Sequence, residues 1–548
     1  MSLPVEKALR KAQSHIKAGE LAEAEELYKQ VLSKFPKNKK AIQGYQKLKV
    51  GITSKGSSTS DPPQEQVQDL INLYNQVHFE KVLEKVKPLI SLFPKAITLH
   101  NIQGASNTAL QRYDAAIASH RKALIIKPDD TDTHCNIGDA LQAKGELDAA
   151  IENYQQAINI KPDHARAYYN LGNALHDHGE LEAAIKNFKQ AVEINSELFQ
   201  AYFNMGNALK FKGELDAAID SYKKAIKIKP DYADAHNNLG SAYLNTGRLK
   251  EGLDENEWRW KTSSASLKKR QFSQPLWDGI TSLKDKTILL WGEQGPGDVV
   301  MWSSCLSLVA SQAEKCILEC EEKLVPLLAR SFPKVEVRAE NRSVDNHRDD
   351  FDVHLPIGSL FRHFIPEISK KTKPNAFLIP DPVRVNFWKE RLNLLGNGPF
   401  VGISWKSPLV TPARLPNYTR IPDWAPVLAL SDVTFVNLQS SEFKDDLAEI
   451  WDKFGVNVHN FDDLDHYNDL DDVAALSASF DVVISVSTAV STIAAGVGTP
   501  TKMLHWRQSP WNNILLTPRG PFVDVFERNT WEAWDNVLHS VAKDIADY

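Results

Sequence analysis

Apolar residues in the first half of the chain recur with helical spacing inside a longer period of 34 residues. Segments that begin at Asn136, Asn170 and Asn204 align without gaps, and a fourth copy opens at Asn238. Each of the three full copies places a glycine in its first helix and an alanine in its second, at the points where paired helices must approach closely. The period therefore predicts stacked pairs of antiparallel helices, each too small to bury its apolar face alone.

A 34-residue helix–turn–helix period is typical of tetratricopeptide repeats (TPRs), so the predicted fold of this half is an α-solenoid, a TPR superhelix. Residues 1–50 predict N-terminal TPR-like helices. The Gly-, Ser- and Pro-rich segment 51–64 predicts a flexible linker. The array itself is expected over residues 65–262, where EGLDENEWRWK (251–261) predicts a capping helix that docks the array onto the next domain. The first repeat then packs elsewhere or on a neighbouring chain, which would be self-association.

The pattern changes to α/β in the second half. Short apolar runs predict buried parallel strands with helices between them. The runs are TILLWG, CILEC, VEVRA and FDVHL in a first set, then FVGISW, TFVNLQ, VNVHNF and DVVISV in a second. Two sets predict two Rossmann-like halves that face a cleft, over residues 263–380 and 381–548.

Composition narrows the function classes. A formal net charge of −6 over 548 residues argues against a protein built mainly to bind nucleic acid. The four cysteines lack a zinc-binding set, and Cys316 and Cys320 are expected in a buried, reduced strand or helix. The N-terminus lacks the apolar core of a signal peptide, and no apolar run reaches membrane-spanning length, so a cytoplasmic protein is expected.

A ladder of carboxamides marks the first helix of the repeats. One repeat position holds an asparagine in four successive copies, and a second position, three residues on, is also polar. Such a ladder on a concave surface can donate to and accept from the backbone of a bound polypeptide; the alternative is that these side chains only face water. The predicted acceptor-binding residues are Asn136, Asn170, Asn204, Asn238, Asn173 and Asn207.

An ordered set of segments carries a family resemblance. EWRWK, PLWDG, LLWGEQGPGD, VGISWK, FVNLQ and DVVISVSTAVSTIAAGVGTP together resemble bacterial TPR-linked glycosyltransferases of the two-Rossmann (GT-B) type, and the second half is similar to the heptosyltransferase-like group. The arrangement also resembles the O-linked N-acetylglucosamine transferases and, more closely, the flagellin glycosyltransferases. That resemblance implies a flagellin partner and a nonulosonic acid donor such as pseudaminic acid. It implies a nucleotide sugar as substrate, such as a CMP-linked one, with no further cofactor and no metal.

The glycine turn EQGPGD, between a strand and a helix, supplies the candidate catalytic residues. Asp298 matches the Gly-Asp of the heptosyltransferase-like proteins and is the candidate general base, with Glu293 in reserve. Asp298 is alternatively a helix N-cap. Gly295 and Gly297 would let the backbone approach the donor.

Residues after the later strands supply the candidate donor-binding site. Lys406, Arg414 and Arg420 follow FVGISW and would balance phosphate charge, unless this is an ordinary exposed loop; Gln439 ends TFVNLQ at the same edge. Ser487 and Thr488 precede a helix whose N-terminus suits phosphate. Ser487 and Thr492 stand where the heptosyltransferase-like pattern has Asp and His, which fits a different donor or lost activity.

Two functions remain open from the sequence. The first is a protein O-glycosyltransferase that transfers a sugar to Ser or Thr of a polypeptide held by the array. The alternative is a non-catalytic TPR adaptor or chaperone with a decayed transferase domain.

The Asp-X-Asp patterns of residues 462–472 precede a helix, so they predict a capped, solvated loop and no metal site.

Overall fold

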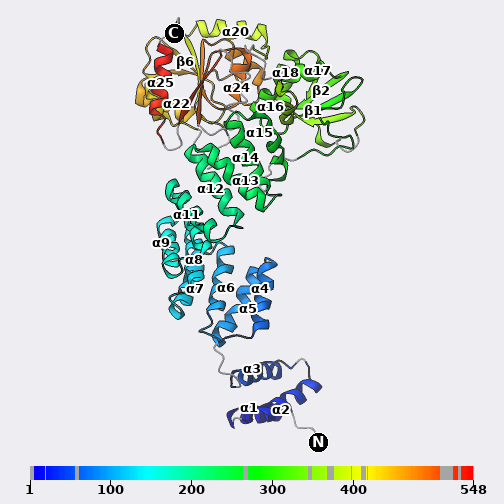
Figure 1. Ribbon diagram of the computed structural model, residues 1–548, viewed down its shortest axis with the longest axis vertical. Coiled ribbons are helices and arrows are strands. Elements are labelled where there is room, and N and C mark those ends of the chain that lie inside the picture. The colour runs from blue at the N-terminus through cyan, green and yellow to red at the C-terminus, as the bar shows by residue number, and fades with distance from the viewer. Residues whose placement is uncertain are drawn as a thin grey trace. The chain divides into compact units, whose positions relative to one another are not determined.

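The computed structural model describes residues 5–18, 20–36, 38–55, 61–262, 269–343, 348–366, 376–396, 398–408, 415, 418–506, 522–528 and 532–546. They fall into two units, residues 1–174 and 175–548, which are described separately (Figure 1). No helix among these residues is long and apolar enough to cross a membrane.

The first unit is built from antiparallel helix pairs. Its helices are α1 (Val5–Ala18), α2 (Leu21–Lys34), α3 (Lys39–Lys55), α4 (Gln64–Asn75), α5 (Phe79–Leu92), α6 (Ile97–Ala109), α7 (Tyr113–Ile126), α8 (Thr131–Lys144), α9 (Leu147–Ile160) and the start of α10 (Ala165–His178). Helices α1–α3 bury their own apolar cluster around Tyr28. The predicted linker is too long at its N-terminal end, because α3 continues through Lys55.

Glycine is required where the two helices of a repeat meet. A Cβ atom on Gly138 would lie 2.5 Å from the ring of Tyr154, and one on Gly206 would lie 2.7 Å from the ring of Tyr222. Both tyrosines are fully buried. The period read from the sequence is thus explained by a small residue packed under an aromatic ring.

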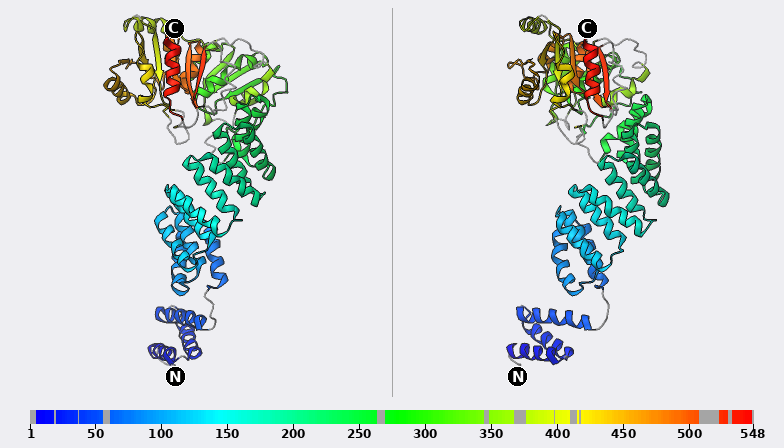
Figure 2. Two further views of the ribbon diagram at one scale, coloured as in Figure 1. Left: turned by 60° about the vertical axis from the view of Figure 1, so that its left-hand side comes forward. Right: turned by 90° about the vertical axis from the view of Figure 1, so that its left-hand side faces the viewer.

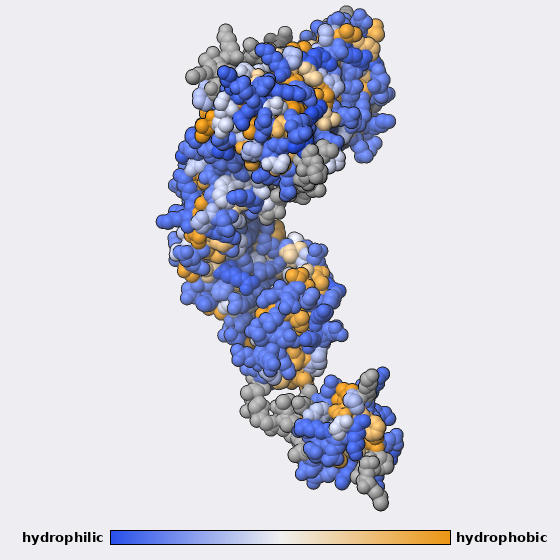
Figure 3. Space-filling view, turned by 90° about the vertical axis from the view of Figure 1, so that its right-hand side faces the viewer, coloured by the Kyte–Doolittle hydropathy of each residue, from blue (hydrophilic) through white to orange (hydrophobic). Residues whose placement is uncertain are grey.

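The second unit begins with the rest of the array. Its helices are α11 (Leu181–Ile194), α12 (Phe199–Lys212), α13 (Leu215–Ile228), α14 (Ala233–Asn245) and α15 (Leu249–Asn256), followed by the 3-10 helix η1 (Glu257–Lys261). The face in Figure 3 is mostly hydrophilic, with scattered apolar residues, as expected for a water-exposed helical array.

A first parallel sheet has the strand order β3-β2-β1-β4. The strands are β1 (Thr287–Trp291), β2 (Lys315–Cys320), β3 (Val335–Ala339) and β4 (Val353–Pro356). Alternate residues of β1 point to opposite faces. Ile288 and Leu290 join a core with α16 (Pro296–Ser303), α17 (Leu306–Ala310) and α18 (Val325–Ser331). Cys316 and Cys320 are buried free thiols on β2, as expected, and burial raises the pKa of Cys316 to about 12.

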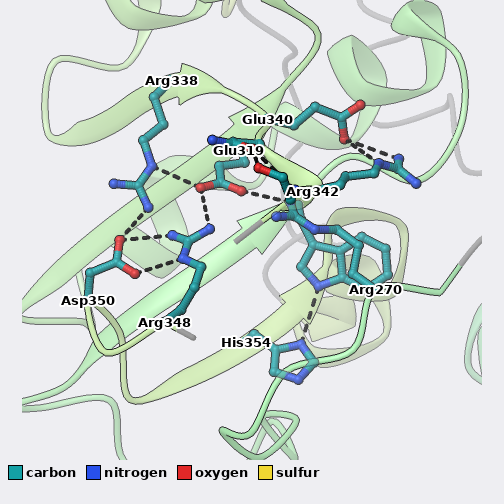
Figure 4. Close-up of polar contacts among 11 residues, drawn as sticks. Arg270, Glu319, Arg338, Glu340, Arg342, Arg348, Asp350 and His354 are labelled. Atoms are coloured by element: carbon teal, nitrogen blue, oxygen red, sulfur yellow. Dashed lines mark hydrogen bonds and ion pairs between the residues drawn. The ribbon is translucent and has the colours of Figure 1, made fainter. Parts of the chain in front are cut away.

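The opposite face of this sheet is covered by side chains from the segment that follows the array. Leu289 and Trp291 pack with Trp260 and Phe272. Near the carboxyl end of β2, the buried carboxylate of Glu319 accepts hydrogen bonds from Arg338 Nε (2.9 Å) and Arg348 Nη1 (2.7 Å). Its other oxygen lies 2.7 Å from Arg270 Nη1 (Figure 4). Because these charges are buried and paired, the segment around residue 270 is tied to the sheet.

A second parallel sheet has the order β10-β9-β8-β5-β6-β7. Its strands are β5 (Phe400–Ser404), β6 (Thr434–Asn437), β7 (Val458–His459), β8 (Val482–Val486), β9 (Thr501–Trp506) and β10 (Val523–Arg528). Helices α20 (Pro382–Asn393), α23 (Leu470–Ser477) and α24 (Ala489–Val497) contribute to its core on one face. Helices α21 (Ala425–Leu428), α22 (Lys444–Phe454) and α25 (Asp535–Ala546) contribute on the other, where Figure 2 shows α25 in red.

The α/β prediction for the second half is therefore confirmed at the level of parallel sheets with intervening helices. The eight predicted strands are present, and β9 and β10 were not predicted. Trp534, Val537, Leu538 and Val541 are buried in the core, and α25 begins at Asp535.

Helix η1 joins the end of the array to the first sheet. The ring of Trp258 stacks on His236 of α14 with centroids 3.9 Å apart, and Trp260 faces Trp291 of β1. Between them, Arg259 is buried and pairs with Glu293, which follows β1: Nε and Nη2 lie 2.9 and 3.0 Å from the two carboxylate oxygens. Leu244 and Leu253 of the array lie in the same apolar cluster as the first sheet. The capping segment thus belongs to the array and to the sheet at once.

We predict that Arg259→Ala lowers the free energy of unfolding of this part of the chain by about 3–5 kcal/mol, because it leaves the Glu293 carboxylate buried without its partner. Arg248→Ala, which removes an exposed arginine of the same array, should change it by less than about 0.5 kcal/mol. Urea unfolding followed by circular dichroism measures both. Equal effects of the two substitutions would contradict a structural role for the pair.

The same variant should show a diagnostic pH dependence. Burial raises the pKa of Glu293, and Arg259 opposes that shift. Without Arg259 the folded-state pKa rises further above the unfolded value. The protonated carboxyl is then tolerated at acid pH, and the loss of stability grows as pH rises from the unfolded pKa through the folded one. We expect Arg259→Ala to be more destabilising at pH 8 than at pH 5, and Glu293→Gln in that background to remove the difference. A pH-independent effect would contradict this account.

Candidate functional site

Glu293, the reserve candidate base in the loop after β1, is enclosed by other side chains. The Glu293 side chain has no exposed surface, and Arg259 also donates to Glu257 (2.7 Å) and to Ser359 Oγ (2.8 Å). A Cβ atom on Gly358 would lie 2.0 Å from Glu293 Oε1, so glycine leaves room for the carboxylate there. The prediction of Glu293 as a reserve base is wrong: both of its oxygens bind a buried guanidinium.

This ion pair lies where an open parallel sheet usually binds a ligand. The chain leaves β1 toward β2 and β3 on one side, and β4 lies on the other, so the carboxyl ends of β1 and β4 form the switch point of the first sheet. Glu293 follows β1, and Ser359 follows β4. In this sheet the switch point is filled by Arg259 from the end of the array.

Asp298 lies near the start of α16. Gly295 is the N-cap residue of α16, so the N-cap interpretation of Asp298 is wrong, and Asp298 lies in the first turn instead. A carboxylate there is stabilised by the positive end of the helix dipole. The side chain is half-buried, and the role of general base remains a prediction.

The starts of α16 and α24 touch each other. A Cβ atom on Gly297 would lie 3.0 Å from Ala489 Cα and 3.2 Å from its amide nitrogen. Gly297 therefore permits close helix packing, which is a structural demand that the sequence interpretation had assigned to a ligand. Since α16 follows β1 and α24 follows β8, the contact brings the carboxyl edges of the two sheets together.

The second sheet has its own switch point, between β5 and β8. Ser404 and Ser485 are paired across these two strands, so Lys406 and Ser487 each follow two residues later at the same edge. Ser487 is exposed, and Thr488 is the N-cap residue of α24, where its amide donates to Ser491 Oγ (3.1 Å). The Thr492 hydroxyl donates to the carbonyl of Thr488 (3.1 Å). The structure thus brings together Lys406, Ser487 and Thr488.

Gln439 is fully buried and binds the backbone that follows β5. Its Oε1 accepts hydrogen bonds from the amides of Trp405 and Lys406, both at 3.0 Å, and its Nε2 donates to the Lys406 carbonyl (2.7 Å). The prediction that Gln439 contacts a nucleotide is wrong, because its carboxamide is used to hold the backbone of the loop. The Lys406 amine lies 2.5 Å from Asp446 Oδ2.

Of the three cations predicted in the loop after β5, Lys406 and Arg420 are among the residues that the structure describes. Arg420 has a side chain that is 82% exposed and pairs with Asp423 at 3.2 Å. It lines a pocket of about 380 Å³ together with Lys406. Arg414 lies outside the described residues.

Several asparagines of the predicted ladder are already hydrogen bonded within the array. In the first unit, Asn170 donates to Asp139 (2.7 Å), and Asn136 accepts from Arg166 (2.9 Å). In the second unit, Asn238 donates to Asn207 (2.8 Å), which also accepts from Tyr222 (2.8 Å). Asn136, Asn170, Asn204, Asn238, Asn173 and Asn207 are half-buried. The ladder therefore ties one repeat to the next, and contact with a polypeptide remains a prediction.

The acidic segment 462–472 behaves as a capped loop. Asp469 accepts from the amide of Asp472 at the start of α23, and Asp463, Asp471 and Asp472 pair with three arginines. Among the described residues, no group of three or more His, Cys, Asp or Glu side chains is placed to hold a metal ion.

The sequence did not predict the roles of several residues near the two switch points. Arg259 and Asp446 act through partners 34 and 40 residues away. Arg528 ends strand β10, which was not predicted. The sequence offered one signal for the ion pair between Arg259 and Glu293: a glutamate just after a buried strand, and an arginine between two tryptophans.

We predict that Gly297→Ala lowers the free energy of unfolding by about 1–3 kcal/mol, because the added methyl group meets the backbone of Ala489. Gly295→Ala is the matched control: its Cβ atom would have 3.8 Å to the nearest atom, and its φ of −69° suits alanine. The control should stay within about 0.5 kcal/mol of the wild type. Thermal unfolding by calorimetry compares them, and a harmless Gly297→Ala would refute the close contact between α16 and α24.

The comparisons with known proteins agree with the repeat assignment. The description "TPR repeat" matches residues 106–145, 138–179, 172–210 and 206–247, and "Tetratricopeptide repeat" matches residues 8–38. The chain is 33% identical over 314 residues to Protein FlbA of Caulobacter vibrioides, an alignment that covers 54% of this chain and 52% of FlbA. The chain therefore spans about half the length of this curated relative.

Solved structures are similar to about a third of this chain. The crystal structure of MamA is 30% identical and covers 28% of this chain and 91% of MamA, with a TM-score of 0.27. YrrB, described as a TPR protein with an unusual peptide-binding site, is 20% identical and covers 32% of this chain and 91% of YrrB, with a TM-score of 0.28. From the repeat matches and the helices together, we conclude that the chain carries an array of TPR repeats ahead of its α/β region.

Proposed function

We propose that this chain is a protein O-glycosyltransferase: the TPR array captures a polypeptide, and the α/β region transfers a sugar from a nucleotide-activated donor to a Ser or Thr hydroxyl. The observation that carries the proposal is the contact between the starts of α16 and α24, which brings the carboxyl edges of two parallel sheets together. Ligands of open α/β sheets bind at such edges.

The phosphate of the donor would bind at the switch point of the second sheet. The amide groups at the start of α24 and its positive dipole end favour an anion, and Lys406 adds a full positive charge on the neighbouring strand end. Asp446, which holds the lysine, would orient it. These groups stabilise the charge that develops on the leaving phosphate as the bond between the sugar and its phosphate breaks.

Asp298 is the proposed general base. It lies one residue after Gly297, which contacts the start of α24, so it would face an acceptor hydroxyl bound at the same edge. It would take the proton from the acceptor hydroxyl while that oxygen bonds to the sugar carbon. Glu293 has no part in this step, because it is sealed against Arg259.

The polypeptide acceptor is proposed from the repeats, because TPR arrays offer long polar surfaces for extended partners. Flagellin and a CMP-linked nonulosonic acid are the first acceptor and donor to test, since the sequence resemblance implies both. The proposed setting is the cytoplasm, where nucleotide sugars would be available.

A second candidate is a TPR adaptor without catalytic activity. It is favoured by the serine and threonine at positions 487 and 492, which supply neither a carboxylate nor an imidazole, and by the filled switch point of the first sheet. The two candidates differ in one measurable respect: only the transferase binds and turns over a nucleotide sugar.

We predict that Asp298→Asn folds normally and captures its acceptor, yet transfers sugar at least ~10²-fold more slowly. Exposed Asp452→Asn is the control and should turn over at the wild-type rate. Mass spectrometry of flagellin incubated with a panel of nucleotide sugars measures the product. Wild-type turnover by Asp298→Asn would remove it from catalysis, and no product with any donor would favour the adaptor.

We also predict that replacing Asn136, Asn170, Asn204 and Asn238 together by alanine weakens acceptor binding at least 10-fold. Each lost hydrogen bond would contribute about 0.5–1.5 kcal/mol. Asn153→Ala with Asn187→Ala is the matched control, because these asparagines donate to carbonyls of their own second helices. Biolayer interferometry with the full chain compares the variants, with melting temperatures to separate folding from binding. Full affinity in the quadruple variant would place the contact elsewhere.

A further inference from the structure

The first three helices differ in charge from the rest of the chain. Residues 1–55 contain eleven lysines and one arginine against five glutamates, a formal charge of +7, so the remainder carries −13 of the total of −6. Helices α1–α3, dark blue in Figure 1, bury an apolar cluster of their own, and α4–α6 bury a separate one. We call α1–α3 the basic module. Such charge asymmetry within one chain is typical of a segment that binds a charged partner.

The outward side of α3 carries much of this charge. Helix α3 contains five lysines and no acidic residue. Ala41 and Leu48 lie in the buried cluster, whereas Lys39, Lys40 and Lys47 are exposed. At about 100° per residue, these three lysines fall within roughly a quarter to a third of a turn around the helix axis. They therefore form one exposed cationic stripe.

The carboxylates of the basic module do not neutralise this stripe. Within the described part of the module, ion pairs join Lys29 to Glu25 (2.8 Å) and His15 to Glu20 (2.6 Å). Both pairs involve glutamates at or near the start of α2, and neither includes a lysine of α3. The stripe is thus a surface whose charge an acidic partner would complement.

An exposed aromatic ring lies in the turn that leads to the stripe. Phe35 is the C-cap residue of α2 and is 50% exposed. Phe93 occupies the same position after α5, but it packs against the cluster formed by α4–α6. Lys34, directly before Phe35, is exposed. The turn between α2 and α3 therefore presents an uncovered ring among lysines, and such aromatic anchors often dominate the energy of an interface.

We propose that this turn and the lysine stripe of α3 form a docking surface for an acidic polypeptide segment that carries an apolar side chain. The partner's carboxylates would lie along Lys39, Lys40 and Lys47, and its apolar side chain would cover Phe35. The inference goes beyond the proposed transferase, because it uses neither the asparagine ladder nor the α/β region.

The residue types favour a polypeptide over a membrane or a nucleic acid. A helix that lies on a membrane presents a large apolar face to the lipid, but the residues exposed beside the lysines of α3 include Gln43 and Gln46. Surfaces that bind single-stranded nucleic acid combine cations with several aromatic rings on which bases stack. The turn offers one such ring, Phe35, and the stripe is built from lysines alone.

Fluorescence anisotropy with the full chain and a labelled peptide of repeated Glu-Glu-Leu triplets, at low salt, tests the inference. We expect the peptide to bind, and Lys39→Gln, Lys40→Gln and Lys47→Gln combined to weaken binding about 10-fold, since each exposed charge contributes modestly. Phe35→Ser should weaken binding about fivefold, as expected for an aromatic anchor.

The matched control replaces Lys223, Lys224 and Lys227 of α13 by glutamine. This variant loses the same charge from another exposed helix face and should keep the wild-type affinity. Melting temperatures of all variants separate loss of binding from loss of folding.

The contrary outcomes are distinct. Unchanged affinity in the α3 variant would overturn the assigned surface, and a peptide that fails to bind the wild type would overturn the inference as a whole. An all-glutamate peptide that binds as tightly would overturn the role of Phe35. Tighter binding to labelled oligothymidylate or to phosphatidylglycerol vesicles would overturn the choice of a polypeptide. None of these outcomes bears on sugar transfer, which is measured separately.

Discussion

The ion pair between Arg259 and Glu293 is the interaction on which the second unit depends. Both side chains are almost completely buried, and the arginine reaches the sheet from a single 3-10 turn at the end of the array. Such a pair is costly to form, because two charges must leave water, and it persists only where its remaining hydrogen bonds are satisfied. Glu257, Ser359 and the space left by Gly358 meet that requirement.

As a result, the two parallel sheets have different roles. In the first sheet, the crevice where strand order reverses is filled by the array's arginine, and one face is covered by Trp260 and Phe272 in place of helices. In the second sheet, helices cover both faces, and the crevice between β5 and β8 is not filled by such a pair among the described residues. The first sheet therefore works as the anchor of the array, and the second is the better candidate for ligand chemistry.

Much of the fold could be predicted from the sequence, because its signals are local. A glycine beneath a ring repeats every 34 residues, and short apolar runs mark each buried strand through β8. Strands β9 and β10 follow without such an obvious apolar run: β9 carries the buried Lys502, which pairs with acidic side chains of β10 and α25. Because lysines are mostly exposed, a lysine in a sequence is normally assigned to the surface, and this made β9 hard to recognise.

The site was predicted less well, because residues that bind a ligand and residues that stabilise the fold can have the same type and position in a sequence. Glu293, Gln439 and Gly297 all stand at strand ends or in a glycine turn, yet they bind an arginine, a backbone loop and a neighbouring helix. Those partners lie tens or hundreds of residues away. Lys406, Ser487 and Thr488 were placed at one edge correctly, since adjacent parallel strands end together.

Hydrogen–deuterium exchange on the full chain, comparing the wild type with Arg259→Ala, tests the central claim most directly. If η1 is a shared part of the array and the sheet, exchange should rise together in residues 233–262 and in the β1 strand with its following loop, residues 287–298. Faster exchange confined to residues 257–261, with β1 and α14 as protected as before, would contradict the claim.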